Sequence, residues 1–137
     1  MMFQRLGIAQ FLGCLIDHIG DKTGIRCYDY PDNVASPLYS AEVTGTEVAN
    51  TKTMYLDVFN VSIHCISEPV EPYSNAPVLG LVQGLQEAMT ESFDLPDPFY
   101  LYRLDFTGMQ ALKRDESGEG HAVLSYRFFV CYGLRCK

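Results

Sequence analysis

The sequence predicts an α+β fold in which one mostly antiparallel sheet of four to five strands is covered on one face by two helices. Three observations favour this two-layer sandwich. Two segments repeat apolar residues at helical spacing, others alternate as strands do, and the order along the chain is α-β-β-β-α-β-β. The 137 residues, 47% hydrophobic and 20% charged, suit one globular domain over residues 1–137.

The first half of the chain is predicted to form one helix and three strands. Met2–Gly20 has apolar residues at the i, i+3, i+4 and i+7 positions of a helix, and Gly20 is a suitable end for it. Ile25–Tyr30 is expected to be a short strand. Leu38–Thr46 alternates as a half-buried strand does, and Thr53–Ser67 is the longest strand candidate.

The two faces of Thr53–Ser67 differ. One face is apolar along its length and comprises Tyr55, Phe59, Val61, Ile63 and Cys65. The other face begins with Leu56 and Val58 and continues with Asn60, Ser62 and His64. Half of this second face is therefore expected to be covered, and half is expected to contact water.

The second half of the chain is predicted to form one helix and two strands. Ser74 or Asn75 can cap a helix that runs to about Ser92. After two prolines, Tyr100–Gln110 alternates as a strand does. His121–Tyr132 is the last strand, because it has an uninterrupted apolar face.

The charge balance and the cysteines argue against several classes of protein. The chain has 10 basic and 17 acidic residues, a net charge of −7, so it lacks the positive field that binds nucleic acid. Its five cysteines form no Cys-x-x-Cys pair, which argues against a disulfide scaffold. Charged residues interrupt Met1–Gly20, so we expect neither a signal peptide nor a membrane span, and a chain that folds reduced in a cytosol.

No arrangement of residues predicts catalysis or a bound metal. His64 and Cys65 are neighbours on a strand, so their side chains point to opposite faces and cannot form a nucleophile–base pair. Cys131 and Cys136, together with His64 and His121, form only a weak zinc pattern. We therefore expect no catalytic residue, no cofactor and no metal. A thiol or metal-dependent enzyme that uses these residues is the alternative from another class.

The end of the sequence resembles a family of small prophage proteins. The resemblance lies in Lys113–Leu124 (KRDESGEGHAVL) and Val130–Lys137 (VCYGLRCK), and Tyr55–Ile66 and Leu79–Thr90 match the same layout. These proteins are encoded in the head–tail gene clusters of long-tailed phages of Gram-positive bacteria and are regarded as minor capsid or tail-completion proteins. In size and element order they are similar to the tail terminators of siphophages, the lambda type included.

The resemblance implies a structural virion protein without catalytic activity. Tail terminators form a ring, usually a hexamer, that caps the tail tube and docks to the neck under the head. The implied partners are further copies of the chain, the tail tube protein and a neck or head-completion protein. DNA would pass through the lumen without specific binding, and no membrane is involved. The chain would assemble in the host cytoplasm and reside in the virion.

Two other readings stay open beside the tail terminator. One is a head-completion or stopper protein of the neck, which is also a small ring-forming domain. The other is a phage-borne inhibitor of a host protein. Binding to purified tails, to filled heads or to a host protein would separate these three.

The contact residues of a ring subunit are expected in polar loops and at the C-terminal end. Gly45–Lys52 and Lys113–Gly120 are polar connections between strands, and the expected contact segments are Gly45–Lys52, Asp115–Glu119 and Leu134–Lys137. The candidate interface residues are Glu47, Lys52, Asp115, Glu116, Glu119, Arg135 and Lys137. The first helix also has apolar residues around so much of its circumference that we expect it to be either deeply buried or partly covered by another chain.

Overall fold

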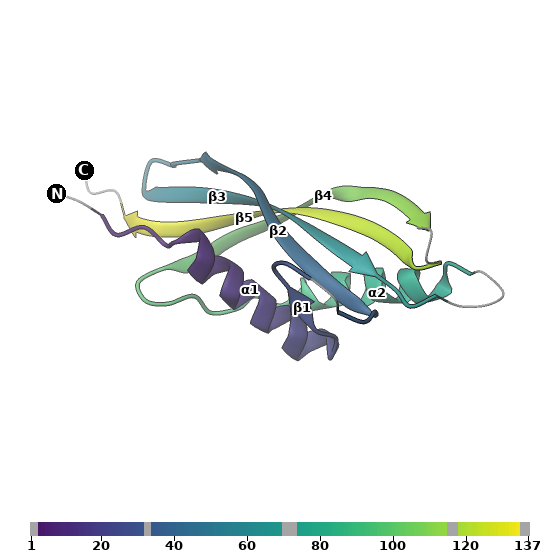
Figure 1. Ribbon diagram of the computed structural model, residues 1–137. Coiled ribbons are helices and arrows are strands. Elements are labelled where there is room, and N and C mark those ends of the chain that lie inside the picture. The colour runs from purple at the N-terminus through teal and green to yellow at the C-terminus, as the bar shows by residue number, and fades with distance from the viewer. Residues whose placement is uncertain (1–2, 32–33, 70–73, 115–117, 135–137) are drawn as a thin grey trace.

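The computed structural model describes residues 3–31, 34–69, 74–114 and 118–134. Within these residues, two helices pack on one face of a five-stranded sheet, and the molecule is elongated along the strands (Figure 1). The predicted α+β fold and its element order are confirmed. In this part of the chain, no helix is long and apolar enough to cross a membrane.

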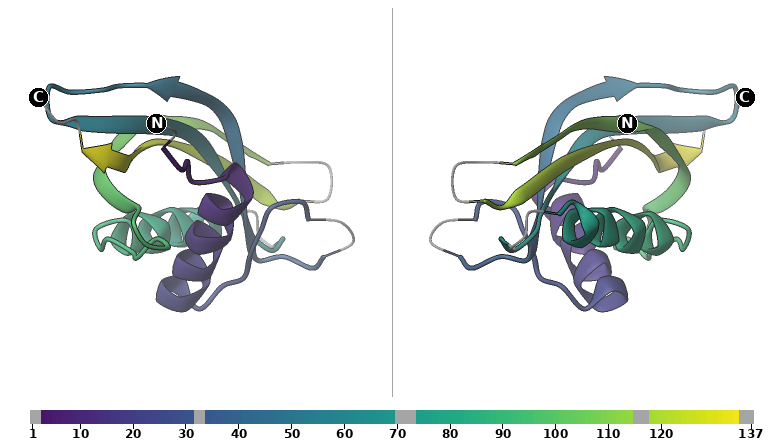
Figure 2. Two further views of the ribbon diagram at one scale, coloured as in Figure 1. Left: turned by 90° about the vertical axis from the view of Figure 1, so that its left-hand side faces the viewer. Right: turned by 90° about the vertical axis from the view of Figure 1, so that its right-hand side faces the viewer.

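The sheet is antiparallel except at one edge. Its strands lie in the order β1-β2-β3-β5-β4; β1 is parallel to β2, and all other neighbours are antiparallel. Views from the two ends show both helices below the same face (Figure 2). The elements are α1 (Ile8–Thr23), β1 (Cys27–Tyr28), β2 (Leu38–Val48), β3 (Met54–Ile66), α2 (Ala76–Ala88), β4 (Tyr100–Arg114) and β5 (Gly120–Leu134).

The first helix lies later in the chain than the predicted Met2–Gly20. Gly24 ends it instead of Gly20, because Gly24 adopts a φ of 73° and donates its N–H to the Gly20 carbonyl at 3.0 Å. The segment before the helix lies along the sheet, where Arg5 forms an ion pair with Asp57 of β3. Apolar residues in this segment therefore pack on the sheet without being helical.

Both long hairpins extend further than their side-chain pattern predicts. β2 continues past the predicted Leu38–Thr46 to Val48, and β4 continues past Tyr100–Gln110 to Arg114. The predicted polar connections therefore belong partly to strands. In β2 the backbone ladder continues to Val48 although the side chains of Thr44, Thr46 and Glu47 are exposed, so the alternation of buried and exposed residues ends before the strand does.

The shorter elements differ for local reasons. β1 is shorter than the predicted Ile25–Tyr30, because it pairs with β2 at two positions only. Asn75 precedes α2 as expected, but α2 ends at Ala88 and not near Ser92. The N–H of Thr90 donates a hydrogen bond to the carbonyl oxygen three residues earlier, at Glu87, instead of four residues earlier, and this ends the α-helical pattern.

The main core lies between the helices and the sheet. Phe11 of α1 stacks on Phe59 of β3 with ring centroids 4.6 Å apart, and it meets Phe128 of β5 edge-on at 5.1 Å. All three side chains are buried. Tyr39 of β2 donates a hydrogen bond to the Leu81 carbonyl at 2.6 Å, which ties the sheet to α2. Aromatic contacts thus attach α1 to the sheet, and a buried hydrogen bond connects α2 to it.

The outer face of the sheet is half covered, as predicted for the longest strand. Leu56 and Val58 of β3 form a second buried cluster with Phe129 and Cys131 of β5. Farther along β3, the outer residues are only half-buried; they are Asn60, Ser62 and His64. The change from apolar to polar residues along this face therefore marks where burial ends.

Gly120 and Gly80 give a matched pair of stability predictions. A Cβ on Gly120 would lie 2.7 Å from Ser67 Oγ and 2.9 Å from Val78 Cβ, whereas a Cβ on Gly80 in α2 meets no atom within 4 Å. Gly120→Ala is expected to lower the free energy of unfolding by about 1–3 kcal/mol. Gly80→Ala is expected to raise it by about 0.5–1 kcal/mol. Urea denaturation measures both, and a Gly120→Ala variant as stable as the wild type would contradict this packing.

Candidate assembly surfaces

Two opposite edges of the sheet are open. Within the described residues, β4 pairs only with β5, and β1 covers β2 only at Tyr39 and Ser40. Residues 41–48 of β2 therefore pair with β3 and with no strand on their other side. An open strand edge presents unpaired N–H and C=O groups, so it is a template for pairing with another chain.

β4 also exposes apolar side chains along its length. Four of them, here called the β4 apolar row, are between 45% and 48% exposed: Tyr100, Tyr102, Phe106 and Met109. Register shifts after Leu101 and after Phe106 break the alternation of this strand. An exposed apolar row on an edge strand is a feature of contact surfaces.

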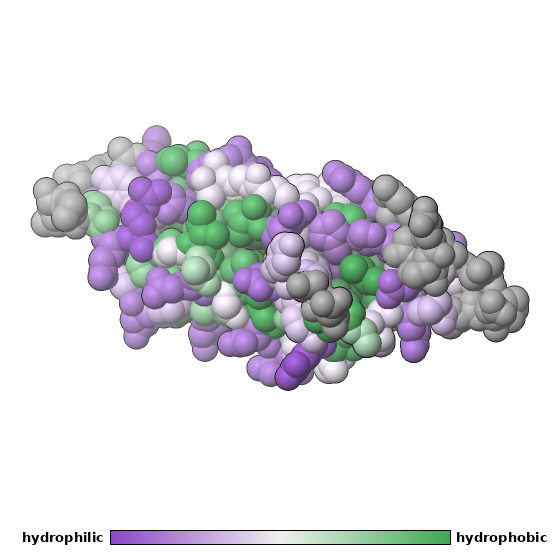
Figure 3. Space-filling view, in the orientation of Figure 1, coloured by the Kyte–Doolittle hydropathy of each residue, from purple (hydrophilic) through white to green (hydrophobic). Residues whose placement is uncertain are grey.

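Further apolar surface lies on the face that Figure 1 presents. In the space-filling view, apolar residues gather in the middle of the molecule, and hydrophilic residues surround them (Figure 3). Large side chains are also exposed away from β4: Ile8 at the start of α1 is 48% exposed, and Val48 at the end of β2 is 66% exposed. The described surface therefore exposes large apolar side chains on α1 and β2 as well as on β4.

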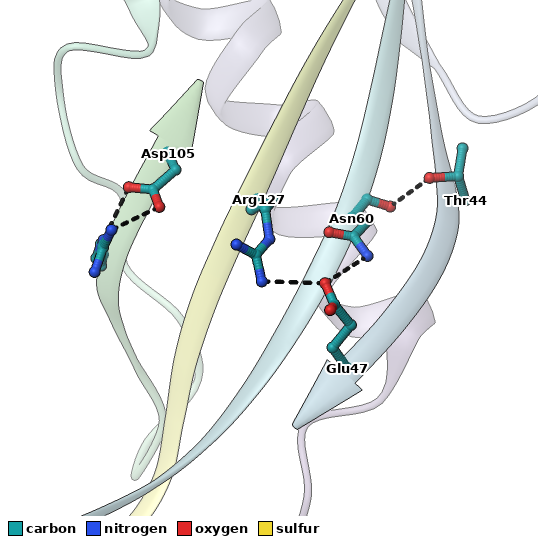
Figure 4. A network of polar contacts seen from close by, with 6 residues as sticks. Thr44, Glu47, Asn60, Asp105 and Arg127 are labelled. Atoms are coloured by element: carbon teal, nitrogen blue, oxygen red, sulfur yellow. Dashed lines mark hydrogen bonds and ion pairs between the residues drawn. The ribbon is translucent and has the colours of Figure 1, made fainter. Parts of the chain in front are cut away.

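A network of hydrogen bonds links β2, β3 and β5 on the outer face of the sheet. Glu47 of β2 accepts hydrogen bonds from the side chains of Asn60 on β3, at 3.0 Å, and Arg127 on β5, at 3.1 Å (Figure 4). Thr44 donates to the Asn60 carbonyl oxygen at 3.2 Å. Glu47, predicted from the sequence as a contact residue, therefore already has partners within its own chain.

The pKa of Glu47 provides a test of this network. The hydrogen bond from Asn60, followed by attraction to Arg127, lowers the pKa of Glu47 below its ordinary value. Ionised Glu47 therefore stabilises the fold at neutral pH, and this stabilisation is lost as the pH falls through the lowered pKa. Asn60→Ala is expected to raise the pKa of Glu47 towards its ordinary value in a carbon NMR titration, while Thr44→Val leaves it unchanged. An unchanged pKa in Asn60→Ala would contradict the role of Asn60.

A second charged group lies on β4. Arg103 contacts both carboxylate oxygens of Asp105, each at 2.9 Å. The guanidinium groups of Arg103 and Arg127 lie 5.0 and 5.1 Å from the centre of the Phe129 ring, which is within the range of cation–π attraction. The outer face therefore carries an ion pair of Arg103 and Asp105 on β4, an arginine on β5 and a carboxylate on β2.

The structure places three of the seven predicted contact residues. Glu47 lies on β2, Lys52 is exposed between β2 and β3, and Glu119 is half-buried just before β5. The other four, Asp115, Glu116, Arg135 and Lys137, lie outside the described residues. Lys52 and Glu119 are at opposite ends of the 13-residue strand β3, roughly 40 Å apart. The predicted residues therefore do not form one patch.

An apolar groove lies at the end of the sheet that carries Lys52. It has a volume of about 450 Å³, and its lining includes Phe3, Tyr100, Tyr132 and Leu134. Leu134 pairs with the first residue of β3, which places the groove beside the turn between β2 and β3. Because Tyr100 also belongs to the β4 apolar row, the groove continues that row to the end of the molecule.

The histidines on the outer face form a chain of contacts. His64 Nδ1 lies 2.9 Å from His121 Nε2, and His64 Nε2 lies 3.0 Å from a carboxylate oxygen of Glu42. Cys65 is buried on the opposite face, as expected, and burial raises its pKa to about 12, so it is a neutral thiol at pH 7. Within the described residues, no three His, Cys, Asp or Glu side chains are arranged to hold a metal ion.

Comparisons with known proteins show which family the sequence matches and which solved structure the fold resembles. A family model described as "Putative tail termination protein" matches residues 2–137. Among solved structures, the fold is similar to a chain in the virion of a native gene transfer agent particle, with a TM-score of 0.66 over 90% of this chain and 96% of that chain. The two chains are 17% identical, so this match concerns the fold. No curated protein matches the sequence. Since the family model spans nearly the whole sequence, the chain belongs to this family of phage tail terminator proteins.

Proposed function

We propose that copies of this chain, six if it follows the tail terminators that it resembles, form a ring that caps the tail tube and provides the docking surface for the head. Family membership gives the chain a structural role in the virion. The observation that carries the finer proposal is the β4 apolar row, because a monomer would leave these four side chains in water at an open strand edge.

The two ends of the molecule support two unlike partners along the ring axis. One end combines Lys52 with the apolar groove and the exposed Leu134. The other end carries Glu119 beside the start of β5. With its strands along the ring axis, such a subunit presents one end to the tail tube and the other to the neck.

The charge of the chain fits a ring through which DNA passes. A net charge of −7 per subunit repels phosphate groups, so DNA can slide through the lumen without specific binding. The proposed role is stoichiometric assembly, beginning in the host cytoplasm, and it uses no catalytic residue, cofactor or metal.

Binding to tails and to heads separates this function from its nearest alternative. A tail terminator is expected to bind one end of purified tails, as one ring per tail in electron micrographs, and to make those tails competent to join filled heads. A head-completion protein would bind filled heads without tails. That result, together with no binding to tails, would overturn the proposal.

A further inference from the structure

The two open edges of the sheet are complementary in direction. β2 and β5 run one way, and β3 and β4 run the other way. A rotation about an axis along the strands preserves these directions, so β4 of one copy meets β2 of the next copy in antiparallel orientation. Such a contact continues the alternation within the sheet, and it is repeated by every further copy around a ring.

The regular stretches of the two edges also have the same length. The register of β2 shifts between Val43 and Gly45, which leaves Gly45–Val48 as a regular stretch. The register of β4 shifts after Leu101 and again after Phe106, which leaves Arg103–Phe106. Each edge therefore has an unbroken stretch of four residues that can pair with a neighbouring strand.

One register between these stretches pairs opposite charges. It places Glu47 opposite Arg103 on the outer face, where their side chains are 50% and 59% exposed. Gly45 then lies opposite Asp105 and leaves room for its carboxylate, because glycine has no side chain. Opposite charges on directly facing residues stabilise an antiparallel pair, whereas like charges destabilise it.

The same register brings exposed apolar residues together. Val48, which is 66% exposed, follows Glu47, and Tyr102, which is 47% exposed and lies at the register shift of β4, precedes Arg103, so the two residues come beside each other. Pairing removes part of both side chains from water. Pairing β4 with β4 of a second copy would instead close after two copies and leave the edge of β2 open.

We propose that neighbouring subunits join edge to edge, with Gly45–Glu47 of one copy paired antiparallel to Arg103–Asp105 of the next, so that Glu47 lies opposite Arg103 and Gly45 lies opposite Asp105. The inference rests on the ring of the proposed function and names the surfaces that build it. Because Glu47 also contacts Arg127 of its own chain, its carboxylate lies between two guanidinium groups in the assembled ring.

Disulfide cross-linking tests this contact. Gly45→Cys and Asp105→Cys place one thiol on each edge, and the Cα atoms of facing residues in antiparallel strands are about 4.5–5.5 Å apart, within the range of a disulfide. With Cys14 and Cys136 changed to Ser, rings assembled on tails are expected to yield a ladder of linked multimers on a non-reducing gel. Gly45→Cys with Gln110→Cys is the matched control, and it is expected to stay monomeric on the gel.

The outcomes separate the contact from the function. Rings that form on tails but yield no ladder would overturn the edge pairing and leave the proposed function in place. Linked dimers from Asp105→Cys by itself would indicate pairing of β4 with β4 and would also overturn it. A wild-type chain that forms no multimer, in solution or on tails, would overturn both.

A charge exchange provides an independent test if the cysteine variant does not assemble. Glu47→Lys or Arg103→Glu is each expected to lower the yield of rings at least about tenfold, because like charges then face each other. The double variant is expected to assemble at least about threefold better than either single variant but less well than the wild type, because the lysine at position 47 then lies beside Arg127 and the glutamate at position 103 beside Asp105. Circular dichroism confirms that all three chains fold. Failure of the double variant to recover would contradict contact between these two residues.

Discussion

Replacing Phe11 by alanine is expected to lower the free energy of unfolding by about 3–5 kcal/mol. The Phe11 side chain is fully buried, stacks on Phe59 at 4.6 Å and meets Phe128 at 5.1 Å. The substitution leaves a cavity where α1 attaches to the sheet, so both apolar burial and dispersion contacts are lost. Equilibrium denaturation in guanidinium chloride measures the change.

A matched control for Phe11 lies on the same helix. Ile8 is 48% exposed, so Ile8→Ala is expected to change the free energy of unfolding by less than about 0.5 kcal/mol. Similar values for Phe11→Ala and Ile8→Ala would contradict the packing of α1 on the sheet.

Adding charge to the β4 apolar row is expected to abolish ring formation while leaving the subunit folded. Phe106 and Met109 are 48% and 46% exposed, so aspartates at these positions stay in water in a monomer. At a subunit contact the carboxylates would lose water without gaining a partner, which costs about 3 kcal/mol or more. Phe106→Asp with Met109→Asp is therefore expected to weaken assembly on tails at least about 100-fold, measured by co-sedimentation with purified tails.

The control for this variant introduces the same charge at an equally exposed position away from the edge of the sheet. Leu79 of α2 is 46% exposed, and Leu79→Asp is expected to assemble as the wild type does. Thermal melting by circular dichroism checks that both variants fold. Normal assembly of the β4 double variant would show that this row is not a subunit contact.

The order of the elements and the buried face of β3 could be predicted, because helical spacing and alternation report which side chains are covered. The residues at which the helices and strands begin and end could not be predicted. Phe3 and Leu6 lie within the predicted helix Met2–Gly20 but pack on the sheet before Ile8, where the helix begins. β2 continues past the predicted Thr46 to Val48, because backbone pairing with β3 persists where the side chains of β2 are exposed.

The surfaces were harder to predict, because they depend on strand order. β5 lies between β3 and β4, which makes β4 an edge strand. Phe106 and Met109 pair with Tyr126 and Leu124, which are buried in the core, yet on the edge strand they are themselves 48% and 46% exposed. Glu47 was predicted as a contact residue from its place in a polar stretch, yet its partner Arg127 is 80 residues away in the chain. No local pattern reports such a contact.

The mass of the purified protein, measured by light scattering with and without assembled tail tubes, tests ring formation most directly. The proposed function predicts either a sixfold multiple of the 15.4 kDa subunit in solution, or a monomer that becomes one stoichiometric ring at one end of each tube. A chain that stays monomeric and does not bind tubes would contradict the proposed function.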